Sequence, residues 1–147
     1  MSWQPLTVHQ MRKIGVMTTI SSPELEAAAK DLGVRIISHT GGRRGYYDER
    51  TRTISLRTDL EGRYYRCTLA HELGHAVFGH DRCNEAHYER KADEWAAGIL
   101  ISASAYKFEE AVHGPNHSII AYELDVTEHM LSVWLDIVRR KGLLPVV

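Results

Sequence analysis

Two histidines and a glutamate in the segment His71-Glu72-Leu73-Gly74-His75 form the clearest chemical pattern in the sequence. Residues four apart lie on one face of a helix, so the imidazoles of His71 and His75 can bind a single zinc ion. Glu72 directly follows the first histidine and could act as a general base on a water bound to that ion. The spacing therefore predicts a catalytic zinc site with two histidine ligands and a glutamate base.

A second acidic pattern offers candidates for the third zinc ligand. A catalytic zinc has three protein ligands and one open position for water. Glu89 and Asp93 are four residues apart in the next predicted helix, so they share a face. We expect Glu89 to bind the metal and Asp93 to accept a hydrogen bond from the non-ligating nitrogen of His71, which would fix the orientation of that ring. Alternative third ligands are Asp81, Glu85 and Glu94.

A closed structural zinc site is an alternative interpretation of the same region. His80, Cys83 and His87 lie near the two ligand histidines in the sequence and could complete such a site. A structural site has no need of Glu72, so we favour the catalytic interpretation. Hydrolysis of a peptide bond also requires a donor that stabilises the oxyanion. The candidates for this donor are Tyr64, His87 and Tyr106.

The two patterns together resemble those of a known protein family. His-Glu-x-x-His followed by Glu-x-x-x-Asp resembles the gluzincin metallopeptidases, and residues 68–75 and 89–100 look more specifically like the ImmA/IrrE family of small zinc metallopeptidases. The resemblance covers residues 22–101 well and the helical tail only loosely. It implies a sheet-plus-helices fold and a zinc site made by His71, His75 and Glu89. It also implies site-specific cleavage of a stress regulator or a transcriptional repressor, often one encoded by a phage or an integrative element.

Two positions depart from the pattern of that family. Residues 100–103 read Leu-Ile-Ser-Ala, where the family usually has a Met-Pro-like end to this helix. Asp93 stands where asparagine is common, which is a conservative change for a group that accepts a hydrogen bond. We therefore keep Asp93 as the predicted partner of His71.

Composition and charge argue against several other classes of protein. The 147 residues are 44% apolar and 25% charged, as in a soluble globular domain, and the two cysteines are too few for a disulfide scaffold. The formal net charge is −1 without a basic block, so direct nucleic-acid binding is not expected. No apolar stretch has the length of a membrane span, and residues 1–17 lack the apolar core of a signal peptide. We expect a cytoplasmic protein whose partner is a protein substrate.

The remaining patterns predict the elements that position these residues. Ser22, Pro23 and Glu24 predict a capped helix start, and Gly33 ends that helix. Runs at residues 34–38, 46–48 and 53–57 predict three strands, which we expect to form a small antiparallel sheet. Helical spacing predicts helices at about 64–79, 86–101, 102–112, 117–124 and 128–141. The fold class is α+β, in one metallopeptidase domain with an N-terminal arm (1–21), a catalytic core (22–101) and a helical tail (102–147).

Several functions are compatible with these predictions. The first is a zinc-dependent endopeptidase that cleaves a specific protein, with an extended substrate added to the strand at residues 53–57. The second is a non-enzymatic, zinc-containing anti-repressor or toxin-like binding module. The third is a DNA reader built on the helix–turn–helix rhythm of residues 117–141. Glu128 and Asp136 on the second helix of that unit favour a packing role for it instead.

Overall fold

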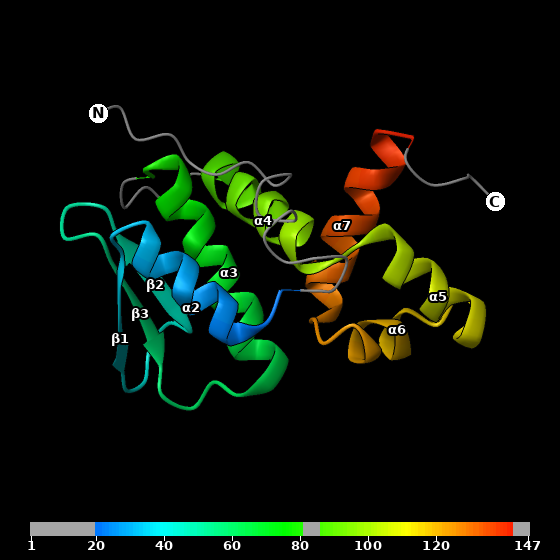
Figure 1. Ribbon diagram of the computed structural model, residues 1–147, viewed down its shortest axis with the longest axis horizontal. Coiled ribbons are helices and arrows are strands. Elements are labelled where there is room, and N and C mark those ends of the chain that lie inside the picture. The colour runs from blue at the N-terminus through cyan, green and yellow to red at the C-terminus, as the bar shows by residue number, and fades with distance from the viewer. Residues whose placement is uncertain (1–19, 81–85, 143–147) are drawn as a thin grey trace.

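The computed structural model describes residues 20–80 and 86–142 (Figure 1). Within them, a three-stranded sheet and six helices form the predicted α+β fold, with the sheet at one end of the molecule and α5, α6 and α7 at the other. Nearly all of the predicted N-terminal arm lies outside the described residues, as do Asp81, Cys83 and Glu85. In chain order the elements are α2 (Ser22–Asp31), β1 (Arg35–His39), β2 (Gly45–Asp48), β3 (Thr53–Arg57), α3 (Gly62–Phe78), α4 (Ala86–Leu100), α5 (Ala103–His113), α6 (His117–Glu123) and α7 (Glu128–Arg140).

The sheet is mixed, with the strand order β1–β3–β2. β1 runs parallel to β3, with Arg35 opposite Thr53, whereas β2 runs antiparallel to β3, with Tyr47 opposite Ile54. The prediction of an antiparallel sheet is therefore wrong for one of the two pairings. β1 and β2 run in opposite directions with a gap between them, and β3 fills that gap, so it must lie parallel to one of its neighbours. Three short strand patterns do not reveal which strands are adjacent.

The central strand β3 has no free edge. Its residues from Thr53 to Leu56 are buried, and the neighbouring strands occupy both of its sides. The expectation that residues 53–57 pair with a substrate strand is therefore wrong. The outer strands of this sheet are β1 and β2, and β2 packs against helix α3.

Helix α2 begins and ends close to the predicted positions. The cap is Ser21 rather than Ser22, because the Oγ atom of Ser21 accepts a hydrogen bond from the backbone N–H of Glu24 at 3.3 Å. Pro23 lies in the first turn, and Gly33 follows the helix with a φ of +73°, a conformation that glycine adopts without strain. This helix packs against α3 and leads directly into β1.

Helix α3 runs through the centre of the molecule and contacts α2, β2, β3 and α4. It approaches α4 very closely at Gly74, where a Cβ atom would lie only 2.9 Å from both the Cα and the carbonyl oxygen of Ala92 in α4. The backbones of α3 and α4 therefore touch at this point. The contact lies between His71 and His75 on α3 and between Glu89 and Asp93 on α4, so it brings the two predicted ligand faces together.

The tail helices pack on this core. Helix α7 lies against α4 and buries Leu131, Trp134 and Leu135, so the predicted packing role of residues 117–141 is confirmed. Among the described residues no helix has both the length and the apolar character needed to cross a membrane.

A buried arginine ties the tail to α3. The side chain of Arg66 is almost fully shielded, and its guanidinium donates hydrogen bonds to four backbone carbonyls. Two of these carbonyls, those of Leu100 and Leu124, lie at the C-terminal ends of α4 and α6, where the helix dipole favours a cation. The other two carbonyls belong to Ile20 and Asp125. This one side chain of α3 therefore joins three other segments of the chain, at Ile20, at the end of α4 and at the end of α6.

Candidate metal centre

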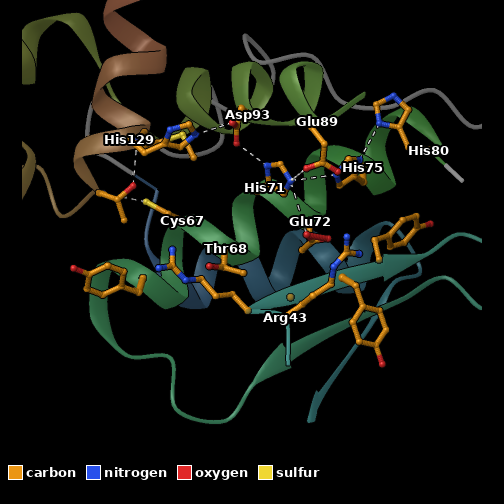
Figure 2. Close-up of a pocket in the computed structure, with 17 residues that line it drawn as sticks. Arg43, Cys67, Thr68, His71, Glu72, His75, His80, Glu89, Asp93 and His129 are labelled. Carbon is orange, nitrogen blue, oxygen red and sulfur yellow. Dashed lines mark hydrogen bonds and ion pairs between the residues drawn. The ribbon is translucent and has the colours of Figure 1, made fainter. Parts of the chain in front are cut away.

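His71 and His75 lie on the face of α3 that is turned toward α4 (Figure 2). Their Nε2 atoms are 3.2 Å apart, and their ring planes are nearly perpendicular, at 87°. The helix and the adjacent Gly74 contact place both rings at one point between α3 and α4. The structure therefore brings these two predicted ligands together.

Glu89 completes a set of three converging ligand atoms. Its Oε2 atom lies 2.9 Å from Nε2 of His71, and its Oε1 atom lies 3.1 Å from Nε2 of His75. Ligands at 2.0–2.1 Å from a tetrahedral zinc ion lie roughly 3.3 Å from one another. The observed separations are close to this value, and two imidazoles with one carboxylate are a donor set that suits zinc. These three residues therefore fit a zinc ion.

Glu72 faces the same point from the interior. Its side chain is only 7% exposed, and its Oε1 atom lies 3.9 Å from Nε2 of His71. Ligand-type atoms of His71, Glu72 and His75 all lie within 4.8 Å of one another, which makes Glu72 a geometric rival of Glu89. Glu89 is the better third ligand because its two oxygens lie within 2.9 and 3.1 Å of the two histidine nitrogens. Glu72 can then serve as a proton acceptor and donor without binding the metal.

Burial and the neighbouring groups shift the pKa values of Glu72, His71 and His75 in different directions. For Glu72 it raises the pKa to about 7, opposed by the positive charges of His71 and Arg43. For His71 burial favours the neutral ring, but the hydrogen bond to Asp93 and the nearby carboxylates outweigh it and raise the pKa to about 9. Burial and the charge on His71 lower the pKa of His75 to about 4. Burial thus makes the carboxyl of Glu72 a better proton acceptor than an exposed glutamate.

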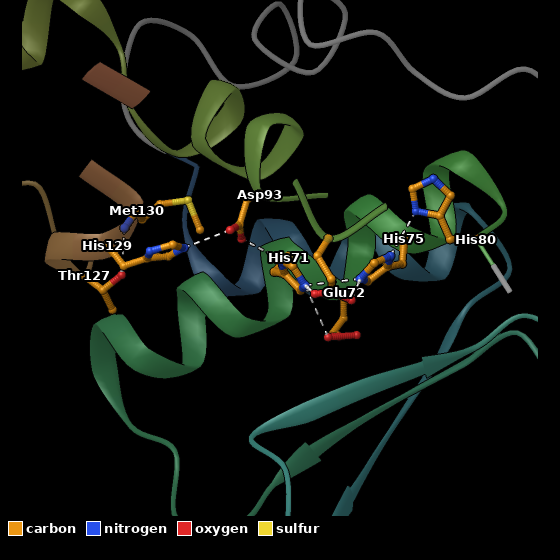
Figure 3. Close-up of polar contacts among 9 residues, drawn as sticks. His71, Glu72, His75, His80, Asp93, Thr127, His129 and Met130 are labelled. Atoms are coloured by element: carbon orange, nitrogen blue, oxygen red, sulfur yellow. Dashed lines mark hydrogen bonds and ion pairs between the residues drawn. The ribbon is translucent and has the colours of Figure 1, made fainter. Parts of the chain in front are cut away.

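Asp93 has the predicted contact and a second contact that the sequence did not indicate (Figure 3). Its Oδ1 atom lies 2.7 Å from Nδ1 of His71, and its Oδ2 atom lies 2.8 Å from Nε2 of His129 in α7. The carboxylate therefore accepts hydrogen bonds from two histidines. Nothing in the local sequence around His129 marks it as part of the site, because its partner is 36 residues away and depends on how α7 packs on α4.

The second predicted ligand, His75, also has a partner at its other nitrogen. Nδ1 of His75 lies 3.0 Å from Nδ1 of His80, which is buried and stacks on the ring of Tyr88. His80 therefore contacts the back of His75, whereas Nε2 of His75 faces Glu89. This placement suits a role in orienting His75 better than a role as a ligand in a closed structural site.

The alternative zinc ligands and the predicted oxyanion donors lie in different parts of the structure. Glu94 forms an ion pair with Arg140 at 2.6 Å, away from the two histidines, while Asp81, Glu85 and Cys83 lie outside the described residues. Among the predicted oxyanion donors, Tyr64 lines the cavity beside the site. Tyr106 is buried and bonded to Glu110, and His87 is exposed on α4 away from the cavity lining.

A cavity of about 1020 Å³ opens over Glu72 and the two histidines (Figure 2). β2 and the loop before it form one wall of this cavity, and the start of α7 forms another. Gly45 in β2 lies directly against α3, because a Cβ atom there would be 2.8 Å from Cγ2 of Thr68 and 3.3 Å from Cγ of Glu72. This close approach sets the edge strand beside the predicted base. The contributions of β2 and α7 to this cavity were not predicted from the sequence.

Comparison with known protein families identifies the chain. The model of the IrrE N-terminal-like domain, a peptidase family, matches residues 29–135, which is well over half of the sequence. The chain belongs to this family. Membership of the IrrE N-terminal-like peptidases confirms the resemblance drawn from the two motifs, and the match reaches beyond residue 101 into α7. The comparison with curated proteins gave no significant match.

Membership of this peptidase family and the site geometry agree on the kind of chemistry. The matched region contains all five predicted site residues, from His71 to Asp93, and also His129. A metallopeptidase-type function is therefore supported, with a possible metal-binding group made by His71, Glu72 and His75. The tail helices fall within the matched region as far as residue 135, so they are part of the family domain.

Proposed function

We propose that the protein is a zinc-dependent endopeptidase that hydrolyses a peptide bond in a specific protein substrate. The observation that carries this proposal is the convergence of His71, His75 and Glu89, whose ligand atoms lie 2.9–3.2 Å apart beside the buried carboxylate of Glu72. Family membership supports a peptide bond as the target. The ligands would be His71, His75 and Glu89, with the fourth position left open.

The reaction depends on Glu72. Zinc bound by the three ligands would polarise the substrate carbonyl and lower the pKa of a coordinated water to about 7. Glu72 takes the proton from the attacking water at its carboxylate and then donates it to the nitrogen of the leaving amine. Burial raises the pKa of this carboxyl, which favours uptake of the proton from the water. Asp93 keeps His71 oriented through the contact at Nδ1.

An extended substrate would pair with the edge strand β2, and not with the central strand β3 as the sequence suggested. The backbone N–H of Arg57 donates to the carbonyl of Arg44 at 2.8 Å. Because hydrogen-bonded and outward-facing residues alternate in an antiparallel pair, the backbone groups of Gly45 and Tyr47 face away from β3. These groups are available to an extended peptide, and Gly45 brings them close to Glu72.

A transcriptional repressor of a phage or mobile element is the substrate that we propose. The resemblance to the ImmA/IrrE family implies a substrate of this kind. A net charge of −1 gives no reason to expect that the protein binds DNA directly instead. The site would then act on a folded regulatory protein at one exposed, extended segment. The alternative of a non-enzymatic binding module predicts the same zinc site without cleavage.

The Glu72→Gln substitution separates these two functions. Purified protein and variant, each loaded with zinc, would be incubated with the repressor encoded beside the gene, and cleavage would be followed by mass spectrometry. We expect Glu72→Gln to bind zinc and fold normally but to lose cleavage by a factor of about 100 or more, in line with the removal of a general base. Glu61→Gln, an exposed change at the start of the same helix, is the matched control and should cleave normally. A Glu72→Gln variant that still inactivates the repressor would indicate that the protein acts by binding alone.

A further inference from the structure

The carboxylate of Asp93 links two helices at the metal centre. Its two oxygens lie 2.7 Å from Nδ1 of His71 on α3 and 2.8 Å from Nε2 of His129 on α7 (Figure 3). A carboxylate can accept hydrogen bonds at both oxygens, whereas the nitrogen of an amide can only donate. An aspartate at position 93 can therefore accept an N–H from both histidines at once, whereas an asparagine has only one accepting oxygen.

The position of His129 is set by the same helix that carries the metal ligands. Side chains of α3 bond to three consecutive residues before α7: Arg66 donates to the carbonyl of Asp125 at 2.7 Å, and Arg63 donates to that of Val126 at 3.3 Å. The backbone N–H of Thr127 donates to the sulfur of Cys67 at 3.5 Å.

The first turn of α7 is also fixed within the helix itself. The hydroxyl of Thr127 accepts the N–H of Met130 at 3.2 Å, which caps the helix. His129 lies within this capped turn, so its backbone is held on one side by the cap and on the other by the contacts to α3. The side chain of His129 remains 67% exposed and lines the cavity. Its contact with Asp93 is therefore made by a surface residue on a firmly anchored backbone.

We propose that His129 is a positioning residue of the metal centre, which acts through Asp93 on His71. By donating to Oδ2, His129 holds the carboxylate so that Oδ1 faces Nδ1 of His71. That hydrogen bond keeps the proton on Nδ1 and leaves Nε2 as the atom that binds the metal. The inference rests on the proposed zinc site and extends it, because the first turn of α7 then forms part of the metal centre.

Zinc affinity tests this role independently of peptidase activity. The dissociation constant of zinc would be measured for the full chain by competition with a chromophoric chelator. His129→Ala should weaken zinc binding by about threefold to tenfold, less than the 10- to 100-fold loss typical of residues that contact a ligand directly. His129→Gln, whose amide can still donate at similar reach, should recover most of the affinity. The control is His117→Ala, which removes an exposed histidine of α6 that does not line the cavity and should leave zinc binding unchanged.

A double-mutant cycle with Asp93→Ala tests the route of the effect. If His129 acts through Asp93, the variant carrying both Asp93→Ala and His129→Ala should bind zinc no more weakly than Asp93→Ala alone. Two losses that multiply would show that His129 acts by another route and would overturn the proposal. Unchanged zinc affinity in His129→Ala would also overturn it. If the unaltered protein does not bind zinc, the proposed zinc site itself is wrong. This result differs from a wrong role for His129, so the two failures are distinguishable.

Discussion

Each of the two candidate ligand histidines is held at both of its ring nitrogens. Nε2 of either ring faces Glu89, while Nδ1 faces Asp93 in the case of His71 and His80 in the case of His75. A neutral imidazole carries one proton, so a partner that accepts at Nδ1 leaves the lone pair of Nε2 free for a cation. The orientation of the ligands is thus decided by residues that would not touch the metal.

Removal of His80 tests this principle at the second ligand. His80→Ala should weaken zinc binding by about 10- to 100-fold, because Nδ1 of His75 loses the partner that fixes its tautomer and ring plane. The measurement is the zinc dissociation constant, with the melting temperature of the chelator-treated protein as a check on folding. His117→Ala, which removes an exposed histidine of α6 outside the cavity lining, is the control. Equal zinc affinity in the His80 and His117 variants would contradict an orienting role for His80.

At the scale of elements, the contact between α3 and α4 determines whether the ligands meet. Gly74 lets the two backbones touch beside Ala92, and this contact lies between the two ligand faces. The ligand atoms of His71 and Glu89 are only 2.9 Å apart, so a small separation of the helices would open the site.

A methyl group at Gly74 should therefore damage both stability and metal binding. In an isolated helix alanine is favoured over glycine by about 1 kcal/mol. Here the Cβ atom would meet backbone atoms of Ala92 at 2.9 Å, and overpacking of this kind costs about 1–3 kcal/mol. Urea denaturation of Gly74→Ala should show reduced stability, together with weaker zinc binding. A variant more stable than the original protein would mean that α3 and α4 do not approach this closely.

The elements that the sequence predicts well are those whose signals are local. Helical spacing, the serine and proline at the start of α2 and the glycines at 33 and 79 mark element boundaries to within a few residues. The same spacing placed Glu89 and Asp93 on one face of α4. The parallel pairing of β1 with β3 and the contact of His129 with Asp93 depend instead on which distant segments lie together. No local pattern contains that information, so these features required the structure.

At the scale of the whole molecule, the buried side chain of Arg66 joins the sheet-bearing half to the tail helices. The guanidinium of Arg66 has no carboxylate partner among the described residues and is satisfied by the carbonyls of Ile20, Leu100, Leu124 and Asp125. Burial lowers the pKa of this group, yet the helix ends that supply two of the carbonyls favour its positive charge. The tail that carries His129 is thus anchored to the helix that carries the predicted zinc ligands.

Loss of this anchor should destabilise the whole domain. Arg66→Met leaves four carbonyls without their donor, and a buried polar group that loses its partner costs about 1–3 kcal/mol. The free energy of unfolding in urea should therefore fall by about 3 kcal/mol or more. Arg63→Met removes one hydrogen bond to a backbone carbonyl, that of Val126, together with weak contacts to Tyr64 and Tyr122 at the surface, and should cost about 1 kcal/mol. Similar losses in both variants would show that Arg66 has no special role in joining the segments.

X-ray absorption at the zinc edge tests most directly whether His71, His75 and Glu89 hold the metal. The spectrum of the zinc-loaded protein should contain only nitrogen and oxygen ligands at about 2.0–2.1 Å, with the scattering pattern of two imidazoles. Glu89→Ala should alter that first shell, whereas Glu94→Ala, which removes the carboxylate paired with Arg140, should leave it unchanged. A sulfur ligand at about 2.3 Å, or an identical spectrum after loss of Glu89, would contradict the proposed site.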